Sequence, residues 1–240
     1  KRQRMEKETY ECHDCRAPFA RTVVRFGKLV FGSTRCDGCI QKFNEKTVAM
    51  KAAEAAAEKD AAWKRVCPAE YRDTDQTHPG LNPLALEAVR RYEPRAFRGL
   101  GLIGETGEGK TRCAFLALRK AHLAGLRVNA VSHNRFSRLA MDAFSGTTEE
   151  RGHARAALDS LKRADVLLLD DLGKAPSTER ADAELEELIE IRTSGQKPLL
   201  WTANGSGAWL SARLGADRGN PATRRLAEFC EIVNLEGGAR

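Results

Sequence analysis

The sequence predicts an α/β protein in which a mostly parallel sheet is flanked by helices, preceded by a small cysteine-containing module and a helical connector. Three observations support this prediction. Beyond Pro94, short apolar segments alternate with helical patterns, which is typical of parallel sheets covered on both faces. A glycine-rich loop joins the first of these apolar segments to a helix. Four of the seven cysteines occur as two CxxC pairs near the start of the chain.

Length and composition favour a folded protein outside the membrane. The 240 residues suit one medium domain and a smaller one, and 42% hydrophobic residues are enough for a core. The longest apolar runs, such as Val166–Leu169, are far shorter than the ~20 residues of a membrane span. No segment has the pattern of a secretion signal. We therefore expect a cytoplasmic protein without a membrane partner.

Basic charge is concentrated in the N-terminal part. Residues 1–65 contain 15 Lys and Arg against 9 Asp and Glu, whereas residues 66–240 contain 25 against 24. A basic surface favours polyanions such as nucleic acids, although an ordinary solvated surface accounts for the same excess.

Four cysteines have the spacing of a metal site: Cys12, Cys15, Cys36 and Cys39. A CxxC turn directs two thiolates at one ion, and two such turns complete a tetrahedral zinc site. Between the pairs, Val23–Phe26 and Leu29–Phe31 flank Gly27 and Lys28 in a hairpin pattern. Two cysteine turns around a hairpin predict a zinc ribbon over residues 1–43. A redox dithiol is the alternative.

The segment that follows predicts a long exposed helix. Ile40–Arg65 contains no Gly or Pro and is rich in Ala, Glu and Lys. Apart from Ala it has few apolar residues, which suits a connector better than a core helix. Cys67 and Pro68 end the pattern. We therefore place a linker helix at residues 44–66 and a second domain at residues 67–240.

Strands and helices alternate in the second domain. The predicted strands are Gly99–Ile103, Arg127–Val131, Val166–Leu169, Lys197–Thr202 and Glu231–Leu235. The predicted helices are Lys110–Ala124, Asn134–Phe144, Arg151–Arg163 and Glu179–Thr193. Such an alternation brings the carboxyl ends of the strands to one edge of the sheet, where α/β proteins bind their ligands.

The loop after the first strand has the GxxxxGK[ST] pattern of a phosphate-binding loop: Gly104, Glu105, Thr106, Gly107, Glu108, Gly109, Lys110 and Thr111. The glycines let backbone N–H groups point at phosphate oxygens, and the next helix adds its positive N-terminal end. Lys110 is expected to reach the β- and γ-phosphates of ATP, and Thr111 to bind Mg²⁺. A chance match rarely falls between a strand and a helix, so we predict nucleotide binding.

A second motif is the apolar strand that ends in Asp170 and Asp171. A buried strand of this kind delivers both carboxylates to the edge of the sheet beside the phosphates. We expect Asp170 to hold Mg²⁺ and Asp171 to orient or deprotonate the attacking water. The alternative is that the two acids only cap the next turn.

Two weaker signals follow. Asn204 ends an apolar strand, so its amide could bind the γ-phosphate or the attacking water, although Asn-Gly-Ser is also ordinary turn chemistry. Arg224 and Arg225 lie near the start of a helix, and arginine is the natural charge to place on a transferring phosphoryl group. Paired arginines are also common on solvated helix faces.

The order of these motifs resembles the AAA+ ATPases. More narrowly, the chain from about Tyr71 to its end resembles the DnaC/DnaI-type helicase loaders and their IstB-type transposition relatives. The resemblance implies that Lys110 and Thr111 form the Walker A motif, and that Asp170 and Asp171 form the Walker B motif. It further implies sensor 1 at Asn204 and an arginine finger that acts on a neighbouring subunit, at Arg225 or its close rival Arg224.

The chain also resembles the phage and Gram-positive loaders of this group, in which a zinc domain is joined to a AAA+ domain. The resemblance therefore implies an ATP-dependent loader of a replicative hexameric DNA helicase onto single-stranded DNA, in a bacterial cell or a phage-infected host. It further implies that the zinc domain binds the helicase, and that the AAA+ domain binds ATP and DNA and self-associates. Within Asn134–Phe144, Arg135 and Arg138 would neutralise DNA phosphates and Phe136 could stack on a base. An amphipathic packing helix is the alternative for this segment.

Two other functions remain open. One is an IstB-type ATPase that assists a DNA transposase, which the separate zinc module disfavours because IstB-like proteins generally lack one. The other is a small-molecule kinase with the same phosphate-binding loop. The tandem acids, Asn204 and the late arginines argue against it.

Overall fold

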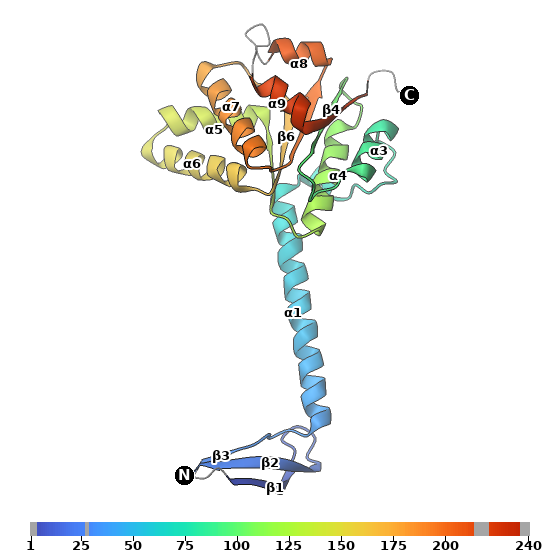
Figure 1. Cartoon of the computed structure of the whole chain (residues 1–240), viewed down its shortest axis with the longest axis vertical. Coiled ribbons are helices and arrows are strands. Elements are labelled where there is room, and N and C mark those ends of the chain that lie inside the picture. The colour runs from blue at the N-terminus through green and yellow to red at the C-terminus, as the bar shows by residue number, and fades with distance from the viewer. Residues whose placement is uncertain (1–3, 27–28, 214–220, 236–240) are drawn as a thin grey trace. The chain divides into compact units, whose positions relative to one another are not determined.

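The computed structural model describes residues 4–26, 29–213 and 221–235, and the chain divides into two compact units (Figure 1). The N-terminal unit is Lys1–Ala61 and the C-terminal unit is Ala62–Arg240. Helix α1 (Asp37–Val66) begins in the first unit and ends in the second, which confirms the predicted long helix. Within the described residues, no helix combines the length and the hydropathy of a membrane span.

The N-terminal unit contains an antiparallel sheet of β1 (Arg4–Glu11), β2 (Pro18–Phe26) and β3 (Leu29–Phe31), in that order. β2 pairs with β3 as predicted for the hairpin, and its turn at Gly27 and Lys28 lies outside the described residues. Among the described side chains of this unit, only Cys12 and Val23 are buried apolar groups. So small a core stabilises little by itself.

Helix α1 is the Ala-rich connector. Asp37 lies in its first turn and Lys64 and Arg65 in its last, so its end charges complement the helix dipole. Ala and charged residues occur on all sides of the helix. Among the described residues of α1, Trp63 is the only one that is buried. Burial begins where the helix enters the C-terminal unit, because Trp63 stacks on His122 there, with the ring centroids 5.5 Å apart.

The C-terminal unit is built on five parallel strands in the order β5-β6-β7-β4-β8, which confirms the predicted fold class. The strands are β4 (Gly99–Gly104), β5 (Val128–Ser132), β6 (Val166–Leu172), β7 (Leu199–Asn204) and β8 (Cys230–Asn234). In β6, Leu167 and Leu169 face one core layer and Val166 and Leu168 face the other. The strand is an unbroken apolar run because both of its faces are buried.

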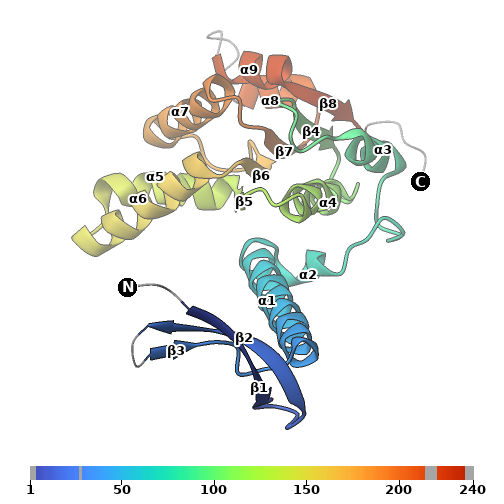
Figure 2. The same ribbon diagram turned by 60° about the horizontal axis from the view of Figure 1, so that its bottom comes forward.

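Helices cover both faces of this sheet (Figure 2). One face packs against the end of α1, α3 (Pro83–Arg91) and α4 (Lys110–Leu123). The other packs against α5 (His133–Ser145), α6 (Thr148–Arg163), α7 (Glu179–Ser194), α8 (Gly207–Arg213) and α9 (Pro221–Phe229). The sequence did not predict α3, α8 or the short α2 (Ala69–Arg72). The parallel pairing places Gly104 beside Asn204, so the predicted motifs meet at one edge.

Candidate functional site

The glycine-rich loop follows β4 and ends at Gly109, which caps helix α4 with φ +71°. A Cβ atom at position 109 would lie 2.2 Å from the carbonyl oxygen of Gly80, so only glycine fits there. The Nδ2 atom of Asn82 also donates a hydrogen bond to Oε2 of Glu108, at 3.0 Å. The segment before α3 therefore braces the loop, and sequence reasoning missed this contribution because it depends on a contact distant in sequence.

Lys110 lies inside the curl of the loop. Its Nζ donates to the carbonyl oxygens of Gly104 at 3.0 Å and Glu105 at 2.5 Å, and the residue is only 5% exposed. Burial lowers the pKa of Lys110, whereas the carboxylates of Asp171 and Glu108 oppose that shift. The ammonium group is thus held among backbone carbonyls, and an anion in the loop would compensate for its lost hydration.

Three oxygen groups converge where the acidic strand ends. The hydroxyls of Thr111 and Thr202 both donate to Oδ1 of Asp170, at 2.9 and 2.6 Å. Burial is the main cause that raises the pKa of Asp170, because water no longer stabilises its charge. A half-buried carboxylate beside a hydroxyl supplies the hard oxygen donors that Mg²⁺ prefers, so these residues fit that ion.

Thr202 is a site residue that sequence reasoning missed. It is fully buried on β7, and its hydroxyl also accepts a hydrogen bond from the backbone N–H of Asp171, at 2.9 Å. It therefore fixes both members of the acidic pair. The available signal was a hydroxyl residue within an apolar strand, two residues before Asn204.

Asp171 has both carboxylate oxygens engaged. Oδ1 accepts a hydrogen bond from Nδ2 of Asn204 at 3.1 Å, so the structure brings together these two predicted site residues. Oδ2 accepts from Nζ of Lys174 at 2.8 Å, and this contact raises the pKa of Lys174. The backbone of Asp171 is left-handed, with φ +57°, which turns its side chain out of the strand pattern.

The two late arginines lie on α9. Nη2 of Arg225 donates to Oε1 of Glu190 on α7 at 3.3 Å, whereas Arg224 is exposed. A different arginine, Arg192, is fully buried and donates four hydrogen bonds to carbonyl oxygens of Leu161, Ala164, Asp165 and Pro198. Burial lowers the pKa of Arg192 to about 10. Arg192 fastens the connection before β6 to the one before β7.

Helix α5 presents Arg135 and Arg138 to solvent. Phe136, however, is fully buried in the core between the sheet and α6, so the expectation that it stacks on a base is wrong. Because a base cannot reach a ring without solvent exposure, the amphipathic packing alternative holds for Phe136.

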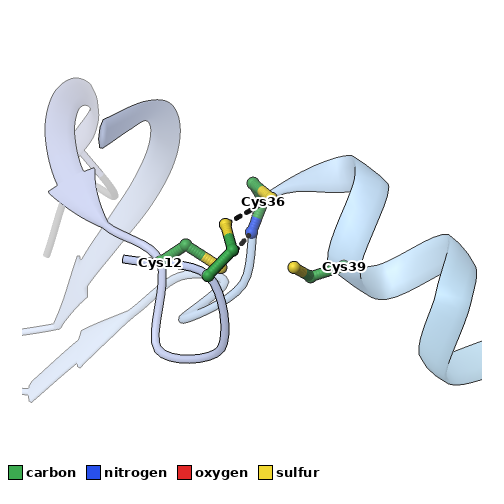
Figure 3. A group of neighbouring side chains, drawn as sticks. Cys12, Cys36 and Cys39 are labelled. Carbon is green, nitrogen blue, oxygen red and sulfur yellow. Dashed lines mark hydrogen bonds between the residues drawn. The ribbon is translucent and has the colours of Figure 1, made fainter. Parts of the chain in front are cut away.

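The four paired cysteines form one cluster in the N-terminal unit (Figure 3). Cys12 and Cys15 lie between β1 and β2, Cys36 precedes α1, and Cys39 lies in the first turn of α1. All four sulfur atoms are within 4.8 Å of one another, and Sγ of Cys15 is 3.7 Å from Sγ of Cys36. Tetrahedral zinc with bonds of about 2.3 Å requires sulfurs about 3.8 Å apart, so the cluster fits the ion.

Charge in the cluster also fits a cation. The backbone N–H groups of Cys15 and Cys36 lower the pKa of Cys12 to about 6, which favours its thiolate. The neighbouring thiols, first Cys36 and then Cys15, raise the pKa of Cys39 to about 12. A dication would compensate the negative charge of the thiolates in the cluster. His13 lies outside the cluster, because its ring contacts Asp14 and is 74% exposed.

The sequence of the C-terminal unit matches a known protein family. The model of the family described as IstB-like ATP binding protein matches residues 93–239. The chain belongs to this family. No curated protein matches the chain in sequence.

Solved structures share the fold of this IstB-like protein. The DnaC helicase loader is 23% identical over 70% of this chain and 100% of that chain, with a TM-score of 0.58. DnaI is 22% identical over 70% and 94%, with a TM-score of 0.56. A putative primosome component from Streptococcus pyogenes serotype M3 is 25% identical over 75% and 97%, with a TM-score of 0.54. The AMPPCP-bound DnaA of Aquifex aeolicus is matched over only 47% of its own length.

These findings confirm the resemblance drawn from the motifs. The C-terminal unit contains the ATP-binding domain of the IstB-like family, and it shares the fold of the DnaC and DnaI structures.

Proposed function

We propose that this IstB-like protein loads a replicative hexameric DNA helicase onto single-stranded DNA. Residues 1–43 would be the zinc-ribbon domain, residues 44–66 the linker helix and residues 67–240 the AAA+ domain. The observation that carries the proposal is the pairing of a separate four-cysteine module with a domain whose fold is shared by the DnaC helicase loader. ATP hydrolysis alone does not need the four-cysteine module, so we infer that this module supplies a second surface that binds a partner.

The phosphate-binding loop supplies the site for ATP. Lys110 exchanges its two carbonyl partners for the β- and γ-phosphates, and the backbone N–H groups from Gly104 to Gly109 surround them. Thr111 and Asp170, whose side chains are hydrogen-bonded to each other, would hold Mg²⁺, and the charge of that ion would screen the phosphates during transfer.

Hydrolysis follows from the groups at the strand ends. Asp171 orients the water that attacks the γ-phosphorus, and it takes up the proton as the bond to ADP breaks. Asn204 holds Asp171 in place and contacts the γ-phosphate. Arg225 of a neighbouring subunit stabilises the charge on the transferring group, with Arg224 as the rival for this role. This last step requires self-association of the AAA+ domain.

The two partners engage different parts of the chain. The four clustered cysteines Cys12, Cys15, Cys36 and Cys39 would hold Zn²⁺, and binding of that ion would supply folding free energy to a unit that buries little else. The folded zinc domain then grips the helicase. Arg135 and Arg138 on the exposed side of α5 neutralise phosphates of single-stranded DNA.

A loading assay on circular single-stranded DNA tests the proposal, because a closed hexamer cannot thread onto a strand without free ends. Elemental analysis of the full chain should give about one zinc per chain. With ATP, the full chain should promote helicase entry, whereas Lys110→Ala should not. Cys36→Ser should lose zinc and loading but retain ATP hydrolysis, since its AAA+ domain is intact.

The family match favours one second candidate, which is assistance to a DNA transposase. The same preparations distinguish the two. Loading that survives the loss of zinc would contradict the role given to the zinc domain. Capture of a transposase instead of a helicase, with ATP-dependent strand transfer, would replace the loader proposal by the transposition alternative.

A further inference from the structure

Lys174 contacts the carboxylate of Asp171, the group that is proposed to orient the attacking water. It ends a tight turn after β6, closed by a hydrogen bond from the N–H of Lys174 to the carbonyl oxygen of Asp171, at 3.1 Å. The turn brings Nζ of Lys174 to 2.8 Å from Oδ2 of Asp171, opposite the oxygen that Asn204 engages. The Lys174 side chain is 56% exposed, so a solvent-borne anion can reach its charge.

A buried histidine holds this turn from one side. Nδ1 of His133 accepts hydrogen bonds from the N–H groups of Gly173 at 3.1 Å and Ala175 at 3.3 Å, which flank Lys174. His133 is only 4% exposed and is the first residue of α5. Because Nδ1 accepts both bonds, its lone pair is free of a proton, and the turn is fastened to the first residue of that helix.

The turn is also confined from another side. A Cβ atom at Gly173, whose φ is +88°, would lie 3.0 Å from the indole ring of Trp209 on α8. The turn therefore packs closely against α8 as well as α5. Gly173 therefore has little room on the side of Trp209, and its N–H is held by His133 on α5.

We propose that Lys174 restrains the Asp171 carboxylate, and that His133 ties this restraint to helix α5, so that DNA bound at Arg135 and Arg138 raises ATP turnover. The inference rests on the proposed function, which makes Asp171 the water-orienting group and α5 the DNA contact. Lys174 and His133 are positioning residues, because they act through Asp171.

The physical reason is the geometry of the contact. Nζ of Lys174 holds Oδ2 of Asp171 while Nδ2 of Asn204 holds Oδ1, so the carboxylate is not turned toward an attacking water until Lys174 releases it. DNA phosphates shift the balance in two ways. They attract Arg135, which lies two residues after His133 in the first turn of α5, and they attract the exposed charge of Lys174 away from Asp171.

The test is steady-state ATP hydrolysis by the full chain, with and without a single-stranded oligonucleotide. Lys174→Gln should raise the DNA-free kcat by roughly two- to fivefold, the scale of an exposed ion pair, and leave the KM for ATP unchanged. The stimulation by DNA should shrink correspondingly, and Lys174→Arg should behave like wild type. Arg163→Gln removes a similarly exposed ion pair within α6 and should change neither constant.

His133 is tested by two variants. His133→Asn places a carbonyl oxygen near the position of Nδ1 and should keep the stimulation by DNA. His133→Leu removes the acceptor and should reduce the stimulation while the oligonucleotide still binds, as measured by fluorescence anisotropy. If His133→Leu does not fold, the Lys174 variants still decide.

The outcomes separate the inference from the function beneath it. A DNA-free kcat that is unchanged or lowered in Lys174→Gln would overturn the inference alone, provided that Asp171→Asn is inactive. If wild type hydrolyses no ATP, or if Asp171→Asn keeps full activity, the proposed mechanism fails and takes the inference with it.

Discussion

At the scale of single residues, the nucleotide site is preassembled by hydrogen bonds that a substrate would replace. Lys110 is satisfied by two backbone carbonyls, and one oxygen of Asp170 serves two hydroxyls. These partners keep buried charges from being unpaired without ATP, which would cost several kcal/mol. Binding therefore exchanges contacts and does not create the site anew, so each residue should fail in its own way when replaced.

Lys110 and Asp171 should separate binding from turnover. Lys110→Ala removes the cation paired with the phosphates, so ATP affinity should fall by at least about 30-fold. Asp171→Asn replaces the carboxylate by an amide of nearly the same size and so removes the charge that orients the water. The kcat should therefore fall by about 100-fold with ATP still bound. Fluorescent nucleotide titration and phosphate release measure the two effects.

Arg163→Ala serves as the matched control, because it removes an exposed cation from the same unit and should leave both constants unchanged. An Asp171→Asn variant that no longer binds ATP would contradict the assignment of the two roles.

At the scale of elements, the alternation of small and large residues between strands sets how closely the sheet packs. Gly101 on β4 lies directly across from Trp201 on β7 in the parallel register. A Cβ atom at position 101 would lie 2.2 Å from Cζ2 of the indole ring. The glycine is thus required by the tryptophan, which is itself almost fully buried in the core.

Gly101→Ala should therefore destabilise the C-terminal unit by roughly 1–3 kcal/mol through overpacking. Trp201→Phe should destabilise it separately by opening space. The double variant should lose less than the sum of the two, because the smaller ring admits the new methyl group. Urea unfolding of the full chain, followed by tryptophan fluorescence, measures each free energy, with Trp63 and Trp209 as remaining probes in the Phe variants.

Gly152→Ala on α6 is the control, since a Cβ atom there meets nothing within 4 Å and alanine favours helices. It should stabilise the unit by up to ~1 kcal/mol. Strictly additive losses for Gly101→Ala and Trp201→Phe would show that the two residues do not compete for the same space.

The elements also show where sequence reasoning works. The central strands β4, β6 and β7 were predictable because burial on both faces leaves apolar runs such as that of β6. β1 was missed because it is mostly charged and is held by cross-strand ion pairs, such as that of Arg21 with Glu8 at 2.6 Å. α3 was not predicted because it has only nine residues and follows a turn-rich stretch, so its helical hydrophobic pattern is too short to stand out.

The same limit applies to the site. Lys110, Thr111, Asp170 and Asp171 belong to local motifs, so the sequence sufficed to propose them. Thr202 and Lys174 act through neighbours that only the sheet register and a left-handed Asp171 bring close. No local pattern carries that information. The two alternatives for Phe136, packing or base stacking, were separated only by the structure, because a helix pattern gives a face but not what covers it.

At the scale of the whole molecule, the four-cysteine cluster and the ATP site lie in different compact units. The basic excess lies in residues 1–65, whereas the ATP site lies in the C-terminal unit. The proposed arginine finger would place part of the ATPase site on a neighbouring chain. Arg225 is held by Glu190 on the surface formed by α7 and α9, where a neighbouring subunit can reach it.

Mixing two inactive variants should therefore restore activity. Arg225→Ala keeps a complete nucleotide-binding half, and Asp171→Asn keeps the finger. At equal amounts, about one quarter of random interfaces should join an intact Asp171 to an intact Arg225, so phosphate release should recover to about that fraction. Mixing Asp171→Asn with Lys110→Ala should stay inactive, because both changes lie in the same half.

If Arg224→Ala complements Asp171→Asn while Arg225→Ala retains its own activity, the finger is Arg224. A mixture that stays inactive although both variants assemble would mean that neither arginine acts across the interface, and each site would then be complete within one chain.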